Sequence, residues 1–507
     1  MSTGGIFQLI TNDGKQDRML MASQLLMTRL VEIRRMRSAA GVRDPTPTLV
    51  DIERTHVLFM NAHFKPFAAI GYEYNKVRPQ SGSAIFGSTI QFSIPQFGDF
   101  FNDMALHLKI SATSAVDNEN EDNADNGKFQ YADFLAHKLA KKVKFSVNGN
   151  PLDEYDTETQ QTHYSFYVKT HKQTGYKRNV GQEVANKGFF VDAVRDIREC
   201  LEFKCGAQTP KTNHDEIEIW LPLLFWFNTD PRLAIPSVSI PYGQRFIDVE
   251  LATLAEITCG DEFDAPEITD AELYINNIFV NPEIHDIFIK RIGFNLIRVH
   301  RIQSQEVTRD ADMVLLNNIK WPVETMYVCF RPDENKDDCE DWHRCHLVNE
   351  IEVCRPWVID PPDTADPESK QLVSRRSSFK KCIPLIETLG VEAHGIKLYD
   401  NFPASFYNSY IPYIRGPDTV TPEDCGRYMI TFNLYPGAYQ PSGHVNVSRA
   451  REFYLNYTAA TLGAAVGGRP AGSKLINEEY PACMAVIAIC INFLLISDGS
   501  AVLRYST

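Results

Sequence analysis

Residues 142–149 read Lys-Val-Lys-Phe-Ser-Val-Asn-Gly, and this stretch decides the fold class. Its apolar residues Val143, Phe145 and Val147 alternate with polar ones, which is the period of a β-strand with one buried face. Asn148-Gly149 ends the alternation, and this dipeptide permits the positive φ angles of a hairpin turn. The stretch therefore predicts a strand that places Phe145 and Val147 in a core, leaves Lys144 and Ser146 outside, and leads into a hairpin.

The same alternation recurs along most of the chain, whereas helical periodicity is nearly absent beyond residue 50. Gly, Pro and Asn-Gly separate the short apolar segments, as they do in β-sandwiches and jelly rolls. Further strands are predicted at residues 90–94, 106–110, 217–227, 246–251, 273–280, 287–299, 326–330, 391–398, 428–434, 484–496 and 501–505. The fold class predicted from these segments is all-β.

The length of 507 residues is too great for one ordinary compact domain, and the 44% of hydrophobic residues is enough for two large cores. An acidic stretch with a proline at 259–269 breaks the composition near the middle. We therefore predict an arm and linker at 1–50, a first sandwich at 51–262 and a second at 263–507. No clean sequence repeat relates the two halves.

The first residues have a different pattern, with apolar residues at helical spacing between about Arg18 and Arg37. The opposite face is basic and carries Arg29, Arg34, Arg35 and Arg37. Asp44-Pro45-Thr46-Pro47 cannot continue a helix. Residues 1–43 hold seven Lys or Arg and three Asp or Glu. We expect a short basic amphipathic helix that serves as an arm, and a helix packed on its own domain is the alternative.

The overall charge excludes one class of function. A net charge of −14 argues against binding to duplex DNA, which requires a basic face, so no direct nucleic-acid partner is expected. No signal peptide is recognised at the N-terminus, and the eleven cysteines are therefore expected to be reduced thiols in a cytosolic compartment. The apolar run 482–496 is too short for a membrane-spanning helix and is predicted to be a buried strand.

No pattern in the chain indicates catalysis, a cofactor or a metal. The group formed by Cys339, His343, Cys345, His346 and Cys354 lacks the ligand spacing of a zinc site. The acidic run 117–127 lacks an oxygen ligand that a calcium loop needs, and the glycine-rich run 463–472 is not a phosphate loop. No HExxH or GxSxG motif is present. We predict no catalytic residue, no cofactor and no metal.

Residues 440–449 read Gln-Pro-Ser-Gly-His-Val-Asn-Val-Ser-Arg. Pro441 and Gly443 suit a tight turn, and the residues after them alternate as in a strand. Arg449 could brace neighbouring strands or an adjacent subunit, and a purely local turn and strand is the alternative.

This run resembles the signature of the major capsid proteins of large nucleocytoplasmic DNA viruses. The resemblance rests on Gln440, Pro441, Ser442, Gly443, Asn446, Ser448 and Arg449. Further blocks resemble the family in the same order, including residues 61–66, 73–79, 95–101, 233–241 and 273–285. The chain departs from the family mainly at 111–142, 156–216 and 331–382. We expect these stretches to form loops at the outer surface, so no exposed detail is carried over there.

The resemblance implies a double jelly roll, that is two consecutive jelly-roll β-sandwiches, with a short helical N-terminal arm. It also implies a homotrimeric capsomer with a pseudo-hexagonal outline, lateral contacts between trimers, and penton and minor capsid proteins as partners. The expected location is the virion capsid, assembled in the host cytoplasm. Because the family places the N-terminus on the inner side, the four arginines of the arm are predicted to contact an inner layer or the inner viral membrane.

Two other functions remain open from the sequence. A double jelly-roll protein could act as a scaffold that shapes an immature virion membrane. A β-sandwich could also bind or hydrolyse carbohydrate, which would require carboxylates gathered in a cleft.

Overall fold

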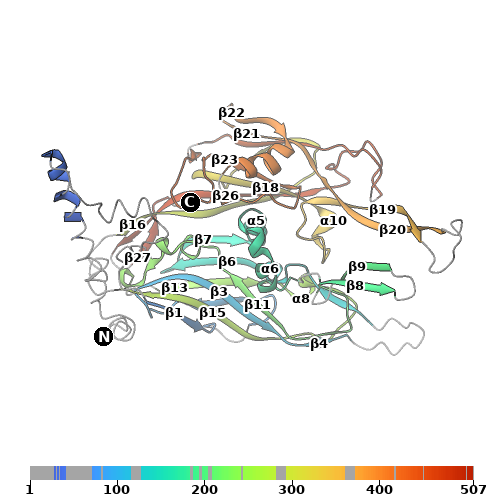
Figure 1. Cartoon of the computed structure of the whole chain (residues 1–507), viewed down its shortest axis with the longest axis horizontal. Helices are drawn as coiled ribbons and strands as arrows, with labels where there is room; N and C mark the ends of the chain where they lie inside the picture. Colours follow the sequence, from blue (N-terminus) through green and yellow to red (C-terminus); the bar gives the residue numbers. More distant parts are fainter. Residues whose placement is uncertain are drawn as a thin grey trace.

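The first half of the computed structural model contains two facing antiparallel sheets (Figure 1). The structure describes residues 25, 28–29, 31–33, 35–41, 71–80, 84–115, 127–182, 186–192, 197–203, 208–240, 244–280, 293–359, 371–415, 418–448, 450–466, 468–497 and 500–505. Sheet 1 has the order β1 (Gly71–Val77), β15 (Ile268–Phe279), β3 (Phe100–Ile110) and β11 (Ile217–Pro222), with β12 (Ile235–Pro236) beside β3. Sheet 2 has the order β2 (Thr89–Ser93), β13 (Arg245–Leu251), β6 (Ala140–Val147) and β7 (Asn150–Asp156).

The second half repeats this arrangement. Sheet 3 has the order β16 (Gly293–Val307), β26 (Ala482–Ser497), β18 (Pro322–Pro332) and β23 (Arg427–Thr431), with β24 (Val445–Asn446) beside β18 and β27 (Ser500–Leu503) beside β26. Sheet 4 has the order β17 (Ala311–Leu315), β25 (Phe453–Ala459), β21 (Ile386–Ala393) and β22 (Ile396–Pro403). Figure 1 shows the four sheets stacked in numerical order.

The two sandwiches share one strand order. When the eight main strands of either sandwich are counted along the chain, its sheets have the orders 1-8-3-6 and 2-7-4-5. This is the wiring of a jelly roll, so the predicted all-β fold with two jelly rolls is confirmed. The structure therefore contains an internal repeat that the sequence does not display.

One hairpin shows how closely the halves correspond. β6 and β7 are joined by Asn148 and Gly149 with φ of 51° and 78°, and β21 and β22 by His394 and Gly395 with φ of 53° and 74°. In the first hairpin, Phe145 pairs with Asp153 and Ser146 with Pro151, which leaves Leu152 as an extra residue. In the second, Val391 pairs with Tyr399 and Glu392 with Lys397, which leaves Leu398 as an extra residue. Both hairpins thus carry the same left-handed turn and the same bulge.

The boundary between the sandwiches differs from the one expected at 262/263. β15 pairs with both β1 and β3, so residues 268–279 belong to the first sandwich. The acidic stretch that suggested the boundary contains β14 (Thr258–Gly260) and the connection into β15. The composition break therefore marks a crossover between two strands of the first sandwich. The second sandwich begins only at β16.

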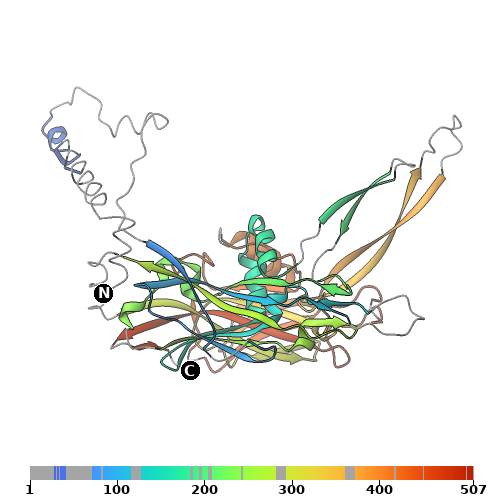
Figure 2. The ribbon, with the colours of Figure 1, turned by 90° about the horizontal axis from the view of Figure 1, so that it is seen from below.

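The remaining elements lie in the connections between main strands. Among the described residues, four two-stranded pairs are present: β4 (Thr113–Ser114) with β10 (Asn213–His214), β5 (Phe129–Tyr131) with β14, β8 (Asn186–Asp192) with β9 (Ile197–Phe203), and β19 (His346–Ile359) with β20 (Gln371–Pro384). The helices are α4 (Leu135–Leu139), α5 (Thr157–Tyr167), α6 (Thr170–Asn179), α7 (Trp226–Thr229), η2 (Pro231–Leu233), η3 (Ser237–Ser239), α8 (Leu254–Ile257), α10 (Asp333–Lys336), η4 (Phe406–Tyr410) and α11 (Ile411–Ile414). Figure 2 shows both long hairpins, β8–β9 and β19–β20, projecting at one end, with the helix of the N-terminal arm at the other.

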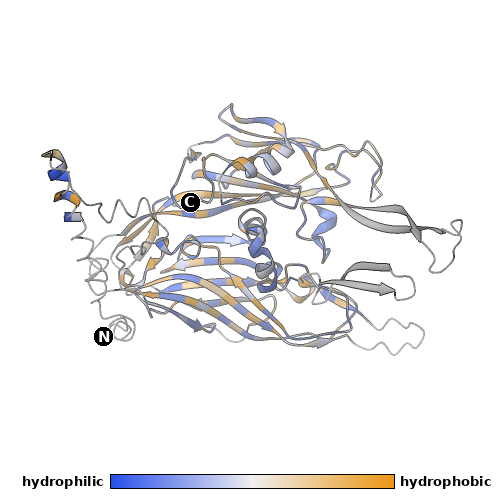
Figure 3. Cartoon of the chain, in the orientation of Figure 1, coloured by the Kyte–Doolittle hydropathy of each residue, from blue (hydrophilic) through white to orange (hydrophobic). Residues whose placement is uncertain are grey.

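The cores lie where the alternation predicts them. Phe145 and Val147 have no exposed side-chain surface, and Ala482–Ser497 is a strand whose residues are largely buried. Ser146, expected outside, is 6% exposed because β27 of the second sandwich lies against β6. Figure 3 shows hydrophobic residues along the strands and mostly hydrophilic ones in α5, α6 and α10. Among the described residues, no helix is both long and apolar enough to cross a membrane.

Candidate assembly site between the sandwiches

Helix α5 joins the two sandwiches. Asp156 begins the helix, because its carboxylate accepts a hydrogen bond from the backbone N–H of Thr159 at 3.0 Å. The helix follows β7 of sheet 2, and its first turn places Glu158 against sheet 3, where the Glu158 residue is only 8% exposed. A carboxylate from the first sandwich is therefore buried among residues of the second.

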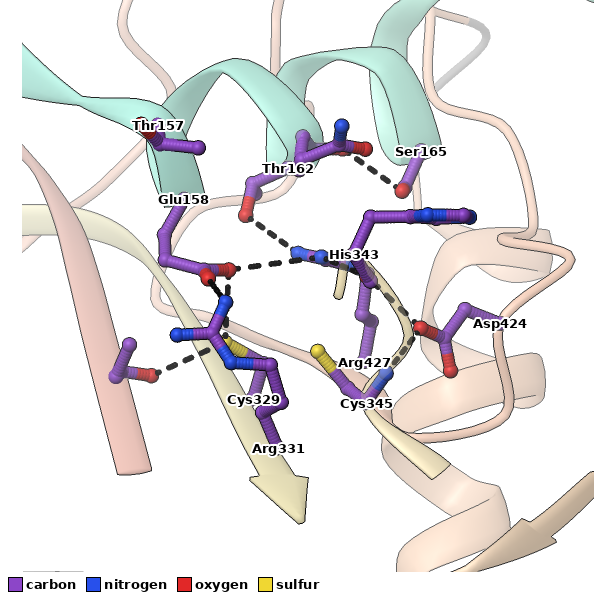
Figure 4. A network of polar contacts seen from close by, with 12 residues as sticks. Thr157, Glu158, Thr162, Ser165, Cys329, Arg331, His343, Cys345, Asp424 and Arg427 are labelled. Carbon is purple, nitrogen blue, oxygen red and sulfur yellow. Dashed lines mark hydrogen bonds and ion pairs between the residues drawn. The ribbon is translucent and has the colours of Figure 1, made fainter. Parts of the chain in front are cut away.

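Two arginines of the second sandwich hold this carboxylate (Figure 4). Arg331 on β18 donates a hydrogen bond to Glu158, and Arg427 Nη2 on β23 lies 3.5 Å from Glu158 Oε2. The negative charge of Glu158 raises the pKa of Arg331 above its ordinary value, although burial acts in the opposite direction. Arg427 also donates to Thr162 Oγ1 on α5 at 3.3 Å and to the carbonyl of His343 at 2.9 Å. A buried charge network of this kind fixes the relative orientation of the two sandwiches.

Asp424 completes the network on the side of the second sandwich. Its carboxylate lies 2.7 Å from His346 Nδ1 and accepts backbone hydrogen bonds from Cys345 at 2.7 Å and Gly426 at 2.8 Å. Arg427 Nε lies 3.6 Å away. Burial disfavours the charge, but these donors and the guanidinium hold the pKa of Asp424 well below its usual range. Asp424 therefore stays ionised and positions Arg427 for Glu158.

A disulfide bond forms a second link between the sandwiches. Cys259 on β14 is bonded to Cys339, which follows α10. Next to it, Asp133 of the first sandwich donates its N–H to the carbonyl of Cys339 at 2.9 Å and accepts a hydrogen bond from Trp342 Nε1 at 2.6 Å. The expectation that all the thiols are reduced is wrong at this pair, since two cysteines 80 residues apart meet at the junction.

The structure brings together only some of the cysteines and histidines that were considered as zinc ligands. Cys339 is in the disulfide, and the side chain of Cys354 lies outside the described residues. Among the described residues, two groups place three donor atoms within 4.8 Å of one another, namely Glu158, Cys329 and Cys345, and His346, Asp424 and Cys425. Glu158 is already paired with arginines and Asp424 with His346. The absence of a metal, a cofactor and a catalytic residue remains a prediction.

The signature turn lies at another part of the junction. Ser442 Oγ accepts the N–H of Tyr435 at 2.9 Å, and Asn446 Oδ1 accepts the N–H of Ser448 at 3.0 Å. Gly443 has φ of 140°, and a Cβ there would lie 3.0 Å from the carbonyl oxygen of Phe432. This position therefore requires glycine.

The first residues of the signature face the other sandwich. Gln440 and Pro441 line a groove of about 660 Å³ together with residues of both sandwiches. The guanidinium carbon of Arg232 in the first sandwich lies 3.6 Å from the ring centroid of Tyr439. Arg449 lies outside the described residues, so its expected bracing role stays a prediction.

The arginines of the arm that the structure describes are not part of the junction. Residues between 25 and 39 are helical where described, and Arg29, Arg35 and Arg37 are exposed on this helix, whereas Arg34 lies outside the described residues. The apolar side is exposed as well, with Leu25 at 60% and Met36 at 66%. Figure 1 shows the helix away from both sandwiches.

Sequence reasoning missed the site in α5. Glu158 lies within 156–216, a region expected to form surface loops, and its helix has no strong apolar face because buried Gln and Thr residues fill it. The available signal was Asp156 followed by Thr159, which suits a helix N-terminus.

Known proteins are similar to this chain over its whole length. Residues 71–281 match a family model described as major capsid protein N-terminus, and residues 279–502 match one described as large eukaryotic DNA virus major capsid protein. A major capsid protein of African swine fever virus (isolate Warthog/Namibia/Wart80/1980) and the hexon protein p72 of its Badajoz 1971 Vero-adapted strain are each 34% identical, over 100% of both chains. The structure of the Faustovirus major capsid protein is 36% identical with a TM-score of 0.75, and the match covers 96% of this chain and 100% of that one.

Proposed function

Because the chain belongs to the major capsid proteins of large eukaryotic DNA viruses and is thus a capsid-forming protein, we propose that three copies form one pseudo-hexagonal capsomer. These capsomers tile the icosahedral shell of the virion, and the chain has no enzymatic activity. The observation that carries the proposal is the pair of jelly rolls with one strand order, joined by a buried network at α5. Three such chains supply six similar units, which suits a hexagonal lattice.

The contacts at the junction support this proposal. A tile must keep its outline while it contacts neighbours on several sides, so its two sandwiches must not move relative to each other. Glu158 with its two arginines and the Cys259–Cys339 disulfide restrict such motion.

The arm supplies the proposed contact with the layer below the shell. Arg29, Arg35 and Arg37 are exposed on a helix that lies away from the sandwiches, on a chain with a net charge of −14. A basic amphipathic helix suits acidic minor capsid proteins or the anionic surface of an inner viral membrane. Penton proteins and neighbouring trimers are the proposed lateral partners, and assembly takes place in the host cytoplasm.

Light scattering and electron microscopy test the capsomer. The purified chain should have a mass near three times 57.6 kDa, and mature virions should show a regular lattice that contains it. A folded chain that stays monomeric at micromolar concentration would contradict the trimer. A shell that loses the chain on maturation would indicate a scaffold instead.

A further inference from the structure

We propose that a basic hollow beside the junction of the two sandwiches binds a soluble anion that carries several phosphate groups. Arg301, Lys320 and Arg504 hold this anion, and all three line the hollow. The inference goes beyond the proposed capsomer and does not depend on it, because all the lining residues belong to one chain.

The basic hollow lies where β7 of the first sandwich meets β16 and β27 of the second (Figure 1). Its volume is about 620 Å³. Glu154 on β7 forms part of its wall, and the other lining residues come mainly from β16, from the connection between β17 and β18, and from the segment after β27. The hollow is therefore built mostly by the second sandwich, at the edge that faces the first.

The three basic residues reach the hollow from three separate segments. Arg301 lies on β16, Lys320 just before β18, and Arg504 just after β27. In the part of the chain that the structure describes, none of these side chains forms an ion pair. The whole chain has 65 acidic and 51 basic residues, so three unpaired cations around one hollow stand out from its composition. An anion between them offsets their mutual repulsion.

The carboxylates next to the hollow already have other partners. Glu154 Oε2 lies 3.1 Å from Nζ of Lys142. Asp153 accepts the N–H of His300 at 2.9 Å. Neither carboxylate forms an ion pair with Arg301, so the protein leaves the charge of this guanidinium for an external anion.

An aromatic ring, rather than a carboxylate, positions Arg301. Its guanidinium carbon lies 3.6 Å from the ring centroid of Trp321, which is itself only 6% exposed. Burial lowers the pKa of Arg301 below its ordinary value, although the charges of Asp153 and Glu154 act in the opposite direction. A guanidinium stacked on a ring keeps its N–H donors, which lie in its own plane, available to an oxyanion.

The arrangement favours a compact anion with several charges. A guanidinium can donate two parallel hydrogen bonds to one phosphate group, and a lysine ammonium acts on phosphate as a point charge. The cations surround a single hollow, whereas an extended acidic peptide requires a row of cations along a groove. A soluble polyphosphate therefore suits the site, and inorganic triphosphate is the simplest probe of it.

Titration calorimetry of the purified full-length chain with inorganic triphosphate tests the site directly. We expect saturable binding of one triphosphate per chain and a melting temperature that rises with triphosphate concentration. The affinity should fall as salt is added, because the attraction is between opposite charges. Absence of saturable binding at millimolar triphosphate would overturn the inference.

Single substitutions locate the bound anion. Arg301→Gln should weaken triphosphate affinity about tenfold. Lys320→Gln and Arg504→Gln alter more exposed cations and should each weaken it about threefold. Arg309→Gln is the matched control, because Arg309 is 72% exposed, pairs with Asp312 and does not line the hollow. Circular dichroism checks the fold of each variant, and the two exposed positions decide the test if Arg301→Gln does not fold.

The arm is the other basic part of the chain, so it requires a separate control. Deletion of residues 1–43 should leave triphosphate affinity unchanged. Loss of binding on this deletion, or equal affinities in Arg301→Gln and Arg309→Gln, would show that triphosphate binds elsewhere and would overturn the inference. A chain that binds triphosphate but stays monomeric would contradict the capsomer alone, and a trimer that does not bind it would contradict the basic hollow alone.

Discussion

Asp153 on β7 and His300 on β16 join the edge strands of two different sandwiches. The backbone N–H of His300 donates to Asp153 Oδ1 at 2.9 Å, and His300 Nδ1 lies 3.1 Å from Asp153 Oδ2. Asp153 is only 4% exposed, so its carboxylate makes these contacts from a buried position.

Replacement of this carboxylate should loosen the junction. Asp153→Ala leaves a buried N–H of His300 without its acceptor, which should lower the free energy of unfolding by about 1–3 kcal/mol. Urea unfolding followed by intrinsic fluorescence measures the loss. Glu154→Ala on the same strand is the control, because Glu154 is half exposed in a surface ion pair with Lys142 and should change stability by less than about 1 kcal/mol. Equal losses would contradict a special role for Asp153.

The buried carboxylate of α5 should matter more. Glu158→Gln leaves Arg331 without its counter-charge and Arg427 with Asp424 alone, so the free energy of unfolding should fall by about 3–5 kcal/mol. Asp418→Ala breaks the exposed pair with Lys169 and should cost about 1 kcal/mol or less. Denaturant titration of the two variants compares them, and a Glu158→Gln loss as small as the control would contradict the network.

The free energy of unfolding should decrease as the pH is lowered below the ordinary pKa of histidine. Burial, with the positive charge of Arg344, lowers the pKa of His343 to about 3, whereas the unfolded chain has a value near 6.5. The unfolded state then binds more protons between these values, so the stabilisation present above about pH 6.5 is lost as pH falls. His343→Gln should reduce the slope of unfolding free energy against pH between about 6.5 and 4.5. His444→Gln is the exposed control, and an unchanged slope for His343→Gln would contradict the assignment.

Reduction of the disulfide should lower the melting temperature. Cys259–Cys339 closes a separation of 80 residues, for which loop entropy predicts a contribution of about 4.5 kcal/mol. Dithiothreitol should lower the melting temperature of the wild type but not that of Cys259→Ser. Cys382→Ser removes an exposed free thiol and should retain the response to reductant. If the wild type melts alike with and without reductant, the bond does not stabilise the junction.

Removal of the arm tests its proposed contact. Deletion of residues 1–43 should leave a folded trimer that binds the inner layer of the virion more weakly, because the arm carries a positive charge on an acidic chain. The triple change of Arg34, Arg35 and Arg37 to Glu should have nearly the same effect, and wild-type binding should weaken with salt. Sedimentation with inner-layer particles measures binding. Failure of the truncated chain to trimerise, or normal virions without the arm, would contradict the contact.

The sequence predicted the elements whose side chains alternate strictly. Phe145 and Val147 are buried as their pattern requires, and Asn148-Gly149 forms the hairpin turn. The predicted boundary near residue 262 differs from the observed one. A local change of composition does not show that β15 pairs with a strand far away in the chain. Pairing depends on contacts far apart in the chain.

The site was harder to predict than the fold. Glu158 looks like a surface residue until Arg331 and Arg427 are brought to it from more than 170 positions away. The prediction of reduced thiols at Cys259 and Cys339 likewise rests on the expected cytosolic compartment, because the sequence does not show that the two sulfur atoms meet. Residue types alone cannot show that their charges or thiols meet.

Both sandwiches lie on one chain, so the polypeptide joins sheets 2 and 3 covalently. This link changes the kinetics with which a ring of sandwiches forms. Sandwiches on one chain meet at an effective concentration that does not fall on dilution, so their junction forms before any encounter between chains. In the proposed ring of six sandwiches, half of the junctions then form within single chains, and only three diffusing bodies must meet instead of six. The formation of rings should therefore depend on the third power of chain concentration at most, which favours complete capsomers when newly made chains are still scarce.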